Sequence, residues 1–550
     1  MYDRTLFRAA ESGHEEAVRV LLKRNDVNSG SVDEYGRTPL CAAAENGHEG
    51  VVRILVEGSN ANLNTADNRL RQTPLSCAAG NGHKGVVRVL LEQNDVNPNL
   101  VDWDGQTPIA LAARDGHEEV VRMLLGRRDV NPNMADRYGR TPVSWAAENG
   151  QEGVVWILLG RSDVNPNTTD KDSQTPLSLA AKNGHEGVVR VLLERSDVDS
   201  GTVDEYGRTP LCVAAKKGHE GVVRILLEQN DVNPNIADRS GRTPVSWAAN
   251  NGHEGVVRIL LEQNDVDPNI ANWISQTPIA LAAMNGHEEV VRMLLEWSDV
   301  NPNIPDLYGR TPLSFAAQNG YEGVVRILLG RSDINSNTAD SILSQTPFAF
   351  APGNGYAGVV KIVPDLNEVI PNKLGRSGWT PLSRAAQGGH EGIVRMLLER
   401  NDVNPERADP DGRTPLSLAA QRGQGGVVRI LLERKEVDPN ALDRDGLSPL
   451  SLAAQKGNEE VVRILLERND INPCAAGRSG QTASSWAARN GYDRIAKLIR
   501  DWVDPTLRYA APQPPTDRAP PGYLSHPNHI LKGSAGLNRQ WWAPPDHAIN

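Results

Sequence analysis

The chain has 550 residues, a formal net charge of −11, 39% apolar residues and only 5% aromatic residues. So few aromatic side chains disfavour one large globular core, and an acidic balance without any run of Lys and Arg disfavours nucleic acid as a partner. The four cysteines lie far apart without a C-x-x-C pair, which argues against a disulfide framework and a cysteine zinc site.

The first residues, Met1 to Arg4, lead into an amphipathic segment and do not have the charged-then-apolar order of a signal peptide. No stretch of about 18 apolar residues occurs, so we predict no membrane span and no membrane partner. We therefore expect an intracellular protein, in the cytoplasm or the nucleus.

A Thr-Pro pair recurs along most of the chain. Together with weaker versions at Arg4-Thr5, Ser448-Pro449 and Thr482-Ala483, it marks fifteen units, separated by twelve intervals of 34 residues and two of 35. A fixed period of about 20 to 50 residues indicates a solenoid or a similar array. We predict one array over residues 1–503, with units that start near residues 4, 38, 73, 107, 141, 175, 209, 243, 277, 311, 346, 380, 414, 448 and 482.

The unit that starts at Thr141 illustrates the local signals. Thr141 is a helix-capping residue, and Pro142 suits the first helical turn, where no amide donor is needed. Asn149-Gly150 predicts the end of this helix, because Gly accepts the left-handed conformation. A second helix is expected over residues 152–159. Its apolar residues cover more than one face, so it should be buried between the neighbouring units.

Two polar segments follow the second helix of this unit. Residues 163–167, Asp-Val-Asn-Pro-Asn, combine several turn-forming residues and predict a loop. Residues 170–174 predict a polar tip that leads back to the next Thr-Pro. Each unit thus reads as helix, tight turn, helix and long loop.

These units resemble the ankyrin repeat, whose pattern is Thr-Pro-Leu-His-x-Ala-Ala-x-x-Gly-His, an apolar helix, and Gly-Ala-Asp-Val-Asn. The resemblance covers roughly residues 3–503, and the form Ser-x-Ala-Ala-x-Asn-Gly-His-Glu-Gly-Val-Val is similar to fungal ankyrin arrays. It implies an all-α solenoid of about fifteen helix-turn-helix units with short β-turn finger loops. It also implies a concave face that binds another protein, without enzymatic activity.

Three features depart from the family pattern. Ser144, Cys41 and Ala110 stand where the family has its first His, so the hydrogen bonding of that His between repeats is not expected here. Asn-Pro-Asn lengthens the loop, which makes the unit 34 residues where the family has 33. Ser162 and Asn230 replace the Gly that ends the second helix, and we expect them to adopt its left-handed conformation.

The unit at Thr346 contains two prolines inside its predicted helices, Pro352 and Pro364. An interior proline costs about 3 kcal/mol or more, so we predict a bend or a local unfolding point between the units at 311 and 380. Residues 504–550 contain nine prolines and are expected to be a disordered tail. Its P-x-x-P at residues 512–515 is a possible SH3-type ligand, and Trp541-Trp542 would either pack on the array or anchor a partner.

Catalytic and metal-binding motifs are not found. No G-x-x-x-x-G-K-[ST] occurs, and two G-x-G-x-x-G matches, residues 80–85 and 353–358, lie in the turn between two helices instead of after a strand. Nine of the twelve His occupy one turn position, where Gln151, Tyr321 and Asn458 replace them, which indicates packing and not metal binding. We predict no catalytic residue, metal, cofactor or small-molecule substrate.

Variable positions on the regular frame are the candidates for recognition. The residue before Thr-Pro is usually Arg or Gln, aromatic residues occur at the tips, and Tyr, Trp and Arg are common at binding hot spots. The alternative is that the tip aromatics merely stack on the neighbouring tip. The candidate partner-binding residues are Tyr35, Arg37, Trp103, Gln106, Tyr138, Arg140, Tyr206, Arg208, Arg242, Trp273, Gln276, Tyr308 and Arg310.

We therefore interpret the chain as a non-enzymatic scaffold or adaptor that binds a protein partner on its concave and finger-loop face. The alternative is the recognition or sensor array of a fungal signalling or incompatibility-type receptor, separated from its nucleotide-binding effector domain.

Overall fold

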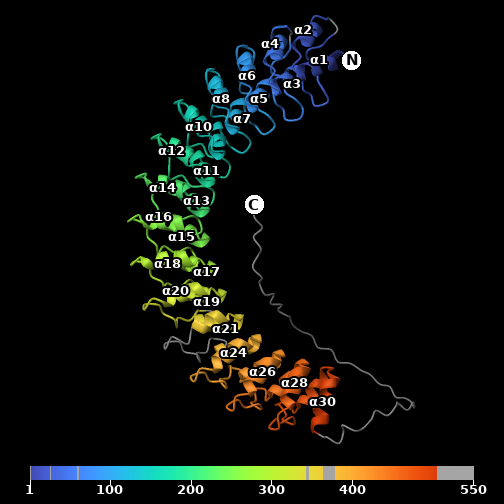
Figure 1. Ribbon diagram of the computed structural model, residues 1–550, viewed down its shortest axis with the longest axis vertical. Helices are drawn as coiled ribbons and strands as arrows, with labels where there is room; N and C mark the ends of the chain where they lie inside the picture. Colours follow the sequence, from blue (N-terminus) through green and yellow to red (C-terminus); the bar gives the residue numbers. More distant parts are fainter. Residues whose placement is uncertain (1, 25–26, 59–60, 342–345, 363–377, 504–550) are drawn as a thin grey trace, which may run out of the picture.

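The computed structural model describes residues 2–24, 27–58, 61–341, 346–362 and 378–503. This part of the chain forms thirty helices, which alternate as the first and second helices of successive pairs, and it contains no strand. The pairs stack side by side into an open crescent, with the first helices along its inner edge and the second helices along its outer edge (Figure 1). The predicted all-α solenoid of helix pairs is confirmed.

The first helices are α1 (Tyr2–Glu11), α3 (Pro39–Glu45), α5 (Pro74–Gly80), α7 (Pro108–Arg114), α9 (Pro142–Glu148), α11 (Pro176–Asn183), α13 (Pro210–Lys217), α15 (Pro244–Asn251), α17 (Pro278–Asn285), α19 (Pro312–Asn319), α21 (Pro347–Asn354), α23 (Pro381–Gly388), α25 (Pro415–Arg422), α27 (Pro449–Lys456) and α29 (Ala483–Arg489). The second helices are α2 (Glu15–Leu22), α4 (Glu49–Gly58), α6 (Lys84–Leu91), α8 (Glu118–Leu125), α10 (Glu152–Leu159), α12 (Glu186–Leu193), α14 (Glu220–Leu227), α16 (Glu254–Leu261), α18 (Glu288–Glu296), α20 (Glu322–Leu329), α22 (Ala357–Ile362), α24 (Glu391–Leu398), α26 (Gly425–Leu432), α28 (Glu459–Leu466) and α30 (Asp493–Val503).

The first helix of a unit begins and ends as its sequence predicts. In α9, the hydroxyl of Thr141 accepts the amide hydrogen of Ser144 at 3.4 Å, and Pro142 is the first helical residue. Gly150 follows the helix with a φ of 73°. The Ser144 and Thr141 hydroxyl oxygens lie 2.9 Å apart, so this Ser makes its contact inside its own unit and does not link units.

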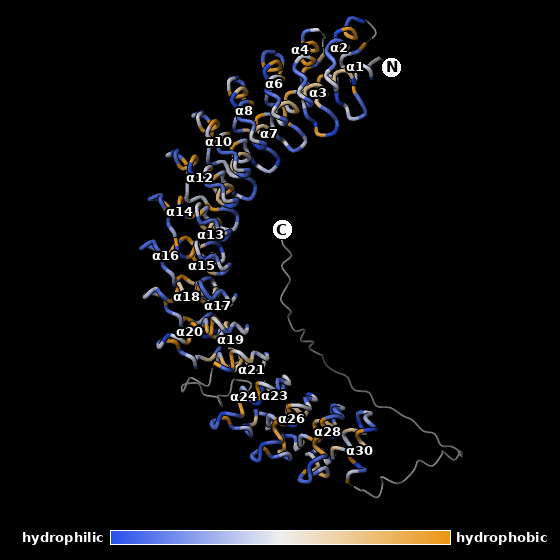
Figure 2. The backbone as a smooth tube through the Cα atoms, in the orientation of Figure 1, coloured by the Kyte–Doolittle hydropathy of each residue, from blue (hydrophilic) through white to orange (hydrophobic). Residues whose placement is uncertain are grey.

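The second helix is buried between its neighbours. In α10, Val154, Val155 and Leu158 are fully or almost fully buried, and the helix packs against α8 and α12. The same residue types at the same positions join into one apolar core that runs the length of the array. Hydrophilic residues are concentrated in the loops that leave the helix stack (Figure 2).

The predicted left-handed end of the second helix is wrong. The chain leaves α10 through Gly160 with a φ of −63°, and neither Ser162 nor Asn230 has a positive φ. An arginine of the next unit binds the end of the helix instead: Nη1 of Arg195 donates to the carbonyl of Leu159 at 3.3 Å. Because this cation satisfies a free helix-end carbonyl, no left-handed residue is needed there.

The turn histidines link consecutive units. Nε2 of His185 lies 2.9 Å from the carbonyl oxygen of Glu148 in the preceding unit. A Cβ on Gly150 would lie 2.7 Å from the His185 ring, so this Gly is required for space as well as for its positive φ. Asn458 donates to the equivalent carbonyl at 3.0 Å. The predicted packing role is confirmed for His48, His83, His117, His185, His219, His253, His287 and His390.

The Asn-Pro-Asn loop links units through its second asparagine. The amide of Asn133 donates to the carbonyl of Asp163 at 2.6 Å, and its Oδ1 accepts the backbone N–H of Asn165 at 2.9 Å. This side chain thus binds two backbone groups of the next unit, one carbonyl and one N–H. We call this arrangement the asparagine bridge. The Asn-Pro-Asn segment, which makes the unit 34 residues long, therefore also joins the unit to the one that follows. The bridge recurs at Asn64, Asn99, Asn167, Asn235, Asn269, Asn303 and Asn440.

The unit with the two prolines keeps its first helix. Pro352 lies inside α21, which packs against both α19 and α23. Thr346 makes no side-chain cap, and the second helix, α22, is described as far as Ile362. Pro364 and the tail at 504–550 lie outside the described residues. The bend or unfolding point and the tail remain predictions.

Glu406 occupies the asparagine position of one bridge. Its Oε1 accepts the N–H of Asp438 at 3.3 Å, but an ionised carboxylate has no hydrogen to donate to the neighbouring carbonyl. Burial raises the pKa of Glu406 to about 7, although the Asp438 N–H bond opposes this. Between about pH 4.5 and pH 7, the folded chain therefore keeps a proton on Glu406 that the unfolded chain, with its ordinary pKa near 4.5, has lost.

We predict that Glu406→Gln removes a pH-dependent loss of stability. Because the folded-state pKa is raised, the contribution of Glu406 is most favourable below about pH 4.5 and is lost as the pH rises to about 7. The difference between pH 5 and pH 8 should be on the order of 1 kcal/mol after solvent screening. Urea unfolding of both proteins at the two pH values measures it. Glu436→Gln, at an exposed neighbour, is the control, and parallel pH profiles for the parent and Glu406→Gln would contradict the prediction.

We also predict that one thiol reacts readily in the folded protein. Cys41, Cys77 and Cys212 are buried, and burial raises the pKa of Cys41 to about 11 and that of the other two above the ordinary value. Cys474 is exposed. Because the thiolate is the reacting species, a maleimide should label Cys474 quickly and the other three only after unfolding. Mass spectrometry of the labelled peptides tests this, and rapid labelling of a buried thiol in native buffer would refute it.

Candidate partner-binding surface

Each unit ends in a tight polar turn, which we call the tip. In residues 136–140, Oδ1 of Asp136 accepts the backbone N–H groups of Tyr138 at 2.8 Å and of Arg140 at 2.9 Å. Gly139 completes the turn with a φ of 80°. The Asp thus shapes the tip. Its sequence signal is an acidic residue four positions, or five at Asp67, before the residue that precedes Thr-Pro or Ser-Pro. It recurs as Asp33, Asp67, Asp102, Asp170, Asp204, Asp238, Asp306, Asp409 and Asp443.

Backbone hydrogen bonds join one tip to the next. The N–H of Lys171 donates to the carbonyl of Tyr138 at 2.8 Å, and the N–H of Arg239 donates to that of Tyr206 at 2.9 Å. Trp273 makes the same bond to Ser240 at 3.1 Å. Because the bonds connect main chain to main chain, the tips keep a fixed spacing along the crescent.

The tip aromatics are half-exposed. Their exposed fractions run from 42% for Tyr308 to 73% for Trp273. Four of these rings contact an arginine, those of Tyr35, Trp103, Tyr206 and Tyr308. Arg208 lies 4.5 Å from the centre of the Tyr206 ring, and Arg310 lies 5.1 Å from that of Tyr308. The exposed aromatic candidates are Tyr35, Trp103, Tyr138, Tyr206, Trp273 and Tyr308.

The arginines before Thr-Pro, apart from Arg242, are held by carboxylates. Nη1 of Arg37 donates to Glu45 at 2.8 Å, and Nε donates to Asp33 at 3.0 Å. Although burial lowers the pKa of Arg37, these two bonds raise it overall. Arg208 and Arg310 each pair with the Asp of their own tip at 2.7 Å. These side chains line the inner edge of the tips and keep part of their surface exposed.

The glutamines at the same position are buried, which corrects their selection as direct contacts. Gln106 is 4% exposed and accepts a hydrogen bond from Arg114 at 3.0 Å. Gln276 is also 4% exposed and accepts one from Asn272 at 3.2 Å. Gln is uncharged and shorter than Arg, so it packs beneath the tip. Neither side chain offers surface to a partner.

Two tryptophans on first helices change this arrangement, and they were missed from the sequence. Nε1 of Trp145 donates to Asp136, and that of Trp247 donates to Asp238, each at 2.9 Å. Since the indole takes the carboxylate, Arg140 and Arg242 lie over the rings instead, at 4.7 and 4.6 Å. The only sequence signal is Trp in place of Leu after Pro-Val-Ser.

The first helices and the tips enclose a groove on the inner side of the crescent. Part of it is a hollow of about 740 Å³ between α11, α13, α15 and their tips, which we call the central groove. The residues that line it include Lys182, Tyr206, Arg208, Lys216, Lys217 and Trp247.

A family model described as ankyrin repeats in three copies matches the chain over residues 3–67, 58–136, 94–170, 126–204, 144–238, 177–272, 264–340, 348–443 and 435–508. The chain belongs to the ankyrin repeat family. Ankyrin repeats generally mediate protein–protein interaction, and proteins built from them are typically non-enzymatic interaction modules. No curated protein matches the chain.

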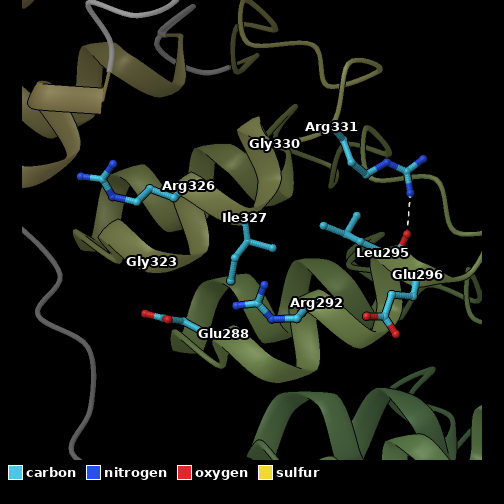
Figure 3. Close-up of a pocket in the computed structure, with 9 residues that line it drawn as sticks. All are labelled: Glu288, Arg292, Leu295, Glu296, Gly323, Arg326, Ile327, Gly330 and Arg331. Atoms are coloured by element: carbon cyan, nitrogen blue, oxygen red, sulfur yellow. Dashed lines mark hydrogen bonds between the residues drawn. The ribbon is translucent and has the colours of Figure 1, made fainter.

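The outer face of the ankyrin array has a shallower hollow, of about 590 Å³, between α18 and α20 (Figure 3). Arg292 pairs with Glu289 at 3.1 Å and Arg326 with Glu322 at 2.7 Å. Arg331 donates to the carbonyl of Leu295 at 2.8 Å, as the dashed line shows. These cations already have partners, so this hollow has little free charge with which to select a ligand.

Two other classes of site are absent from the described ankyrin units. Within them, no helix is both long and apolar enough to cross a bilayer. The same residues bring together no group of three or more His, Cys, Asp or Glu side chains with the geometry to hold a metal ion. The inner face with its tips is therefore the surface that we consider for recognition.

We predict that Ser275→Gly stabilises its ankyrin tip. Ser275 has a φ of 60°, where most tips have Gly, and a left-handed non-glycine residue costs about 1–2 kcal/mol. Gly also raises the conformational entropy of the unfolded chain, which offsets part of this gain. The net increase in stability should therefore be about 0.5–1 kcal/mol. Hydrogen exchange of the tip amides measures it. Gly309→Ser should have the opposite effect, since its Cβ would lie 2.8 Å from the nitrogen of Ser341. Unchanged protection in Ser275→Gly would disprove the strain.

Proposed function

We propose that this ankyrin protein is a non-enzymatic scaffold or adaptor that holds a protein partner on its inner face and tips. The observation that carries the proposal is the row of half-exposed aromatic side chains on tips joined by backbone hydrogen bonds. Large aromatic groups and arginines supply most of the energy at protein interfaces. Because the tips are already ordered, they would lose little conformational freedom when a partner binds them.

The geometry suits an extended contact with several anchor points. Several tips present an aromatic ring beside an arginine, as in Tyr206 with Arg208 and Tyr308 with Arg310. A partner would place apolar side chains against the rings and acidic or carbonyl groups near the arginines. Gln106 and Gln276 are left out of this contact row because they are buried.

We predict that replacing four tip aromatics by alanine weakens partner recovery about tenfold or more, as expected when hot-spot rings are removed. The variant changes Tyr35, Trp103, Tyr138 and Tyr206, and pull-downs from cell extract compare it with the parent. Circular dichroism must show that the variant stays folded.

Trp156→Ala is the matched control. Trp156 is 58% exposed on α10, at the outer edge of the crescent, so its loss should leave recovery unchanged. Equal recovery of partners by the parent and the tip variant would contradict the proposal. A loss that occurs only in Trp156→Ala would move the contact to the outer face.

A further inference from the structure

Two units of the chain place a tryptophan in the same position, and one of these tryptophans lines the central groove. The units at Thr141 and Thr243 share the sequence Thr-Pro-Val-Ser-Trp-Ala-Ala, and in both the Trp donates to the tip Asp at 2.9 Å. The two units differ at the next position, which is Glu148 in one and Asn250 in the other. This difference changes the charge around the indole ring.

At Trp145 the cations at the two positions equivalent to Arg242 and Lys216 each have a carboxylate partner. Arg140, over the ring, pairs with Glu148 at 2.5 Å. Arg114, which comes from the first helix of the preceding unit, pairs with Asp115 at 2.9 Å. The charges of this site are therefore balanced within the chain.

At Trp247 the same two positions have no such partners. Arg242 lies 4.6 Å from the ring centre and Lys216, from the preceding unit, lies 4.1 Å from it. Within the described residues neither forms an ion pair, because Asn250 replaces the acid and Asp238 is bound to the indole and to backbone N–H groups. Burial and the neighbouring cations Arg208, Lys217 and Arg242 lower the pKa of Lys216, and burial lowers that of Arg242.

The walls of the central groove add to this charge. Lys182 and Lys217 line it beside Lys216, and Nζ of Lys182 contacts only the amide oxygen of Gln174 among the described residues. Five basic residues, Lys182, Arg208, Lys216, Lys217 and Arg239, line the hollow against four acidic ones, Asp172, Asp204, Glu205 and Asp238. The hollow is therefore net positive in a chain with a net charge of −11. An acidic ligand would be repelled by most of the molecule and attracted here.

We propose that the central groove binds an acidic peptide segment of the partner, with a carboxylate placed beside Trp247, where the cations Lys216 and Arg242 contact the ring. This inference rests on the proposed function and names the chemistry of the partner. The two cations are already partly desolvated, so an incoming carboxylate gains their attraction without paying the full cost of their dehydration. The methylene groups of an acidic side chain would pack on the exposed parts of Trp247 and Tyr206.

The rim of the groove favours a peptide over a nucleic acid. Asp172 and Glu205 are exposed at its edge. They would repel a phosphate backbone, whose charges lie on the chain itself, more strongly than an acidic peptide, whose flexible side chains can turn away from them. The chain's own residues 504–550 carry three acidic and four basic side chains, so they are not an acidic segment. We therefore assign the acidic segment that occupies the central groove to a second protein.

The test uses fluorescence anisotropy of the full chain with a labelled hexaglutamate peptide at low ionic strength. Asn250→Glu restores the acid that Glu148 provides at the other tryptophan, so the substitution has a folded precedent in the same molecule. We expect it to weaken binding about tenfold, which is the loss of one charge pair of roughly 1.4 kcal/mol. Added salt should weaken binding by the parent as well.

Control variants and probes make each outcome decisive. Asn149→Glu, at the neighbouring exposed position of the balanced site, adds the same charge away from the groove and should leave affinity unchanged. Hexaglutamine should not bind. Absence of hexaglutamate binding, equal affinity for the parent and Asn250→Glu, or tighter binding of a single-stranded oligonucleotide would each overturn the proposal.

The two proposals fail separately. If the tip variant loses its partners while Asn250→Glu keeps both the partners and the hexaglutamate, the chain is an adaptor but the central groove is not an acidic-peptide site. If hexaglutamate binding is weakened by Asn250→Glu while the tip variant recovers partners normally, the acidic-peptide site in the central groove is supported and partner binding by the tip aromatics is contradicted.

Discussion

The second helices impose the constraint on which the rest of the structure depends. A helix such as α10 has apolar residues on more than one face, and no single unit has enough surface to cover them. Burying one such side chain gives about 1.5–3 kcal/mol, so Val154, Val155 and Leu158 together favour stacking strongly. A unit becomes stable only between two others, and the crescent follows from repeating that contact.

Polar contacts then fix how the units align. His185, Arg195 and Asn133 each bind a backbone carbonyl in an adjacent unit, at the inner turn, at the helix end and in the loop respectively. Apolar packing is non-directional, whereas these hydrogen bonds have defined lengths and angles. They also explain the tolerance at the turn, where Gln or Asn can reach the same carbonyl as His.

What could be predicted from the sequence is what depends on neighbours along the chain. The start of α9 at Pro142, its end near Gly150 and the span of α10 follow from capping residues and from apolar spacing. The left-handed end of the second helix was mispredicted because Arg195, more than thirty residues away, binds its carbonyl. The burial of Gln106 and the pairing of Arg140 with Glu148 likewise depend on how a tip folds over its own first helix.

The asparagine bridge has a consequence for the history of the array. Each bridge spans one junction and uses only side-chain atoms of one residue and backbone atoms of the next unit. Removal or insertion of one whole period leaves the same donor opposite the same acceptor, whatever the neighbouring unit contains. A gene encoding such a protein can therefore gain or lose units by recombination between its own repeats and still encode a folded chain. Pairs of similar units such as those at Thr141 and Thr243 can then diverge by single residues into sites of different charge.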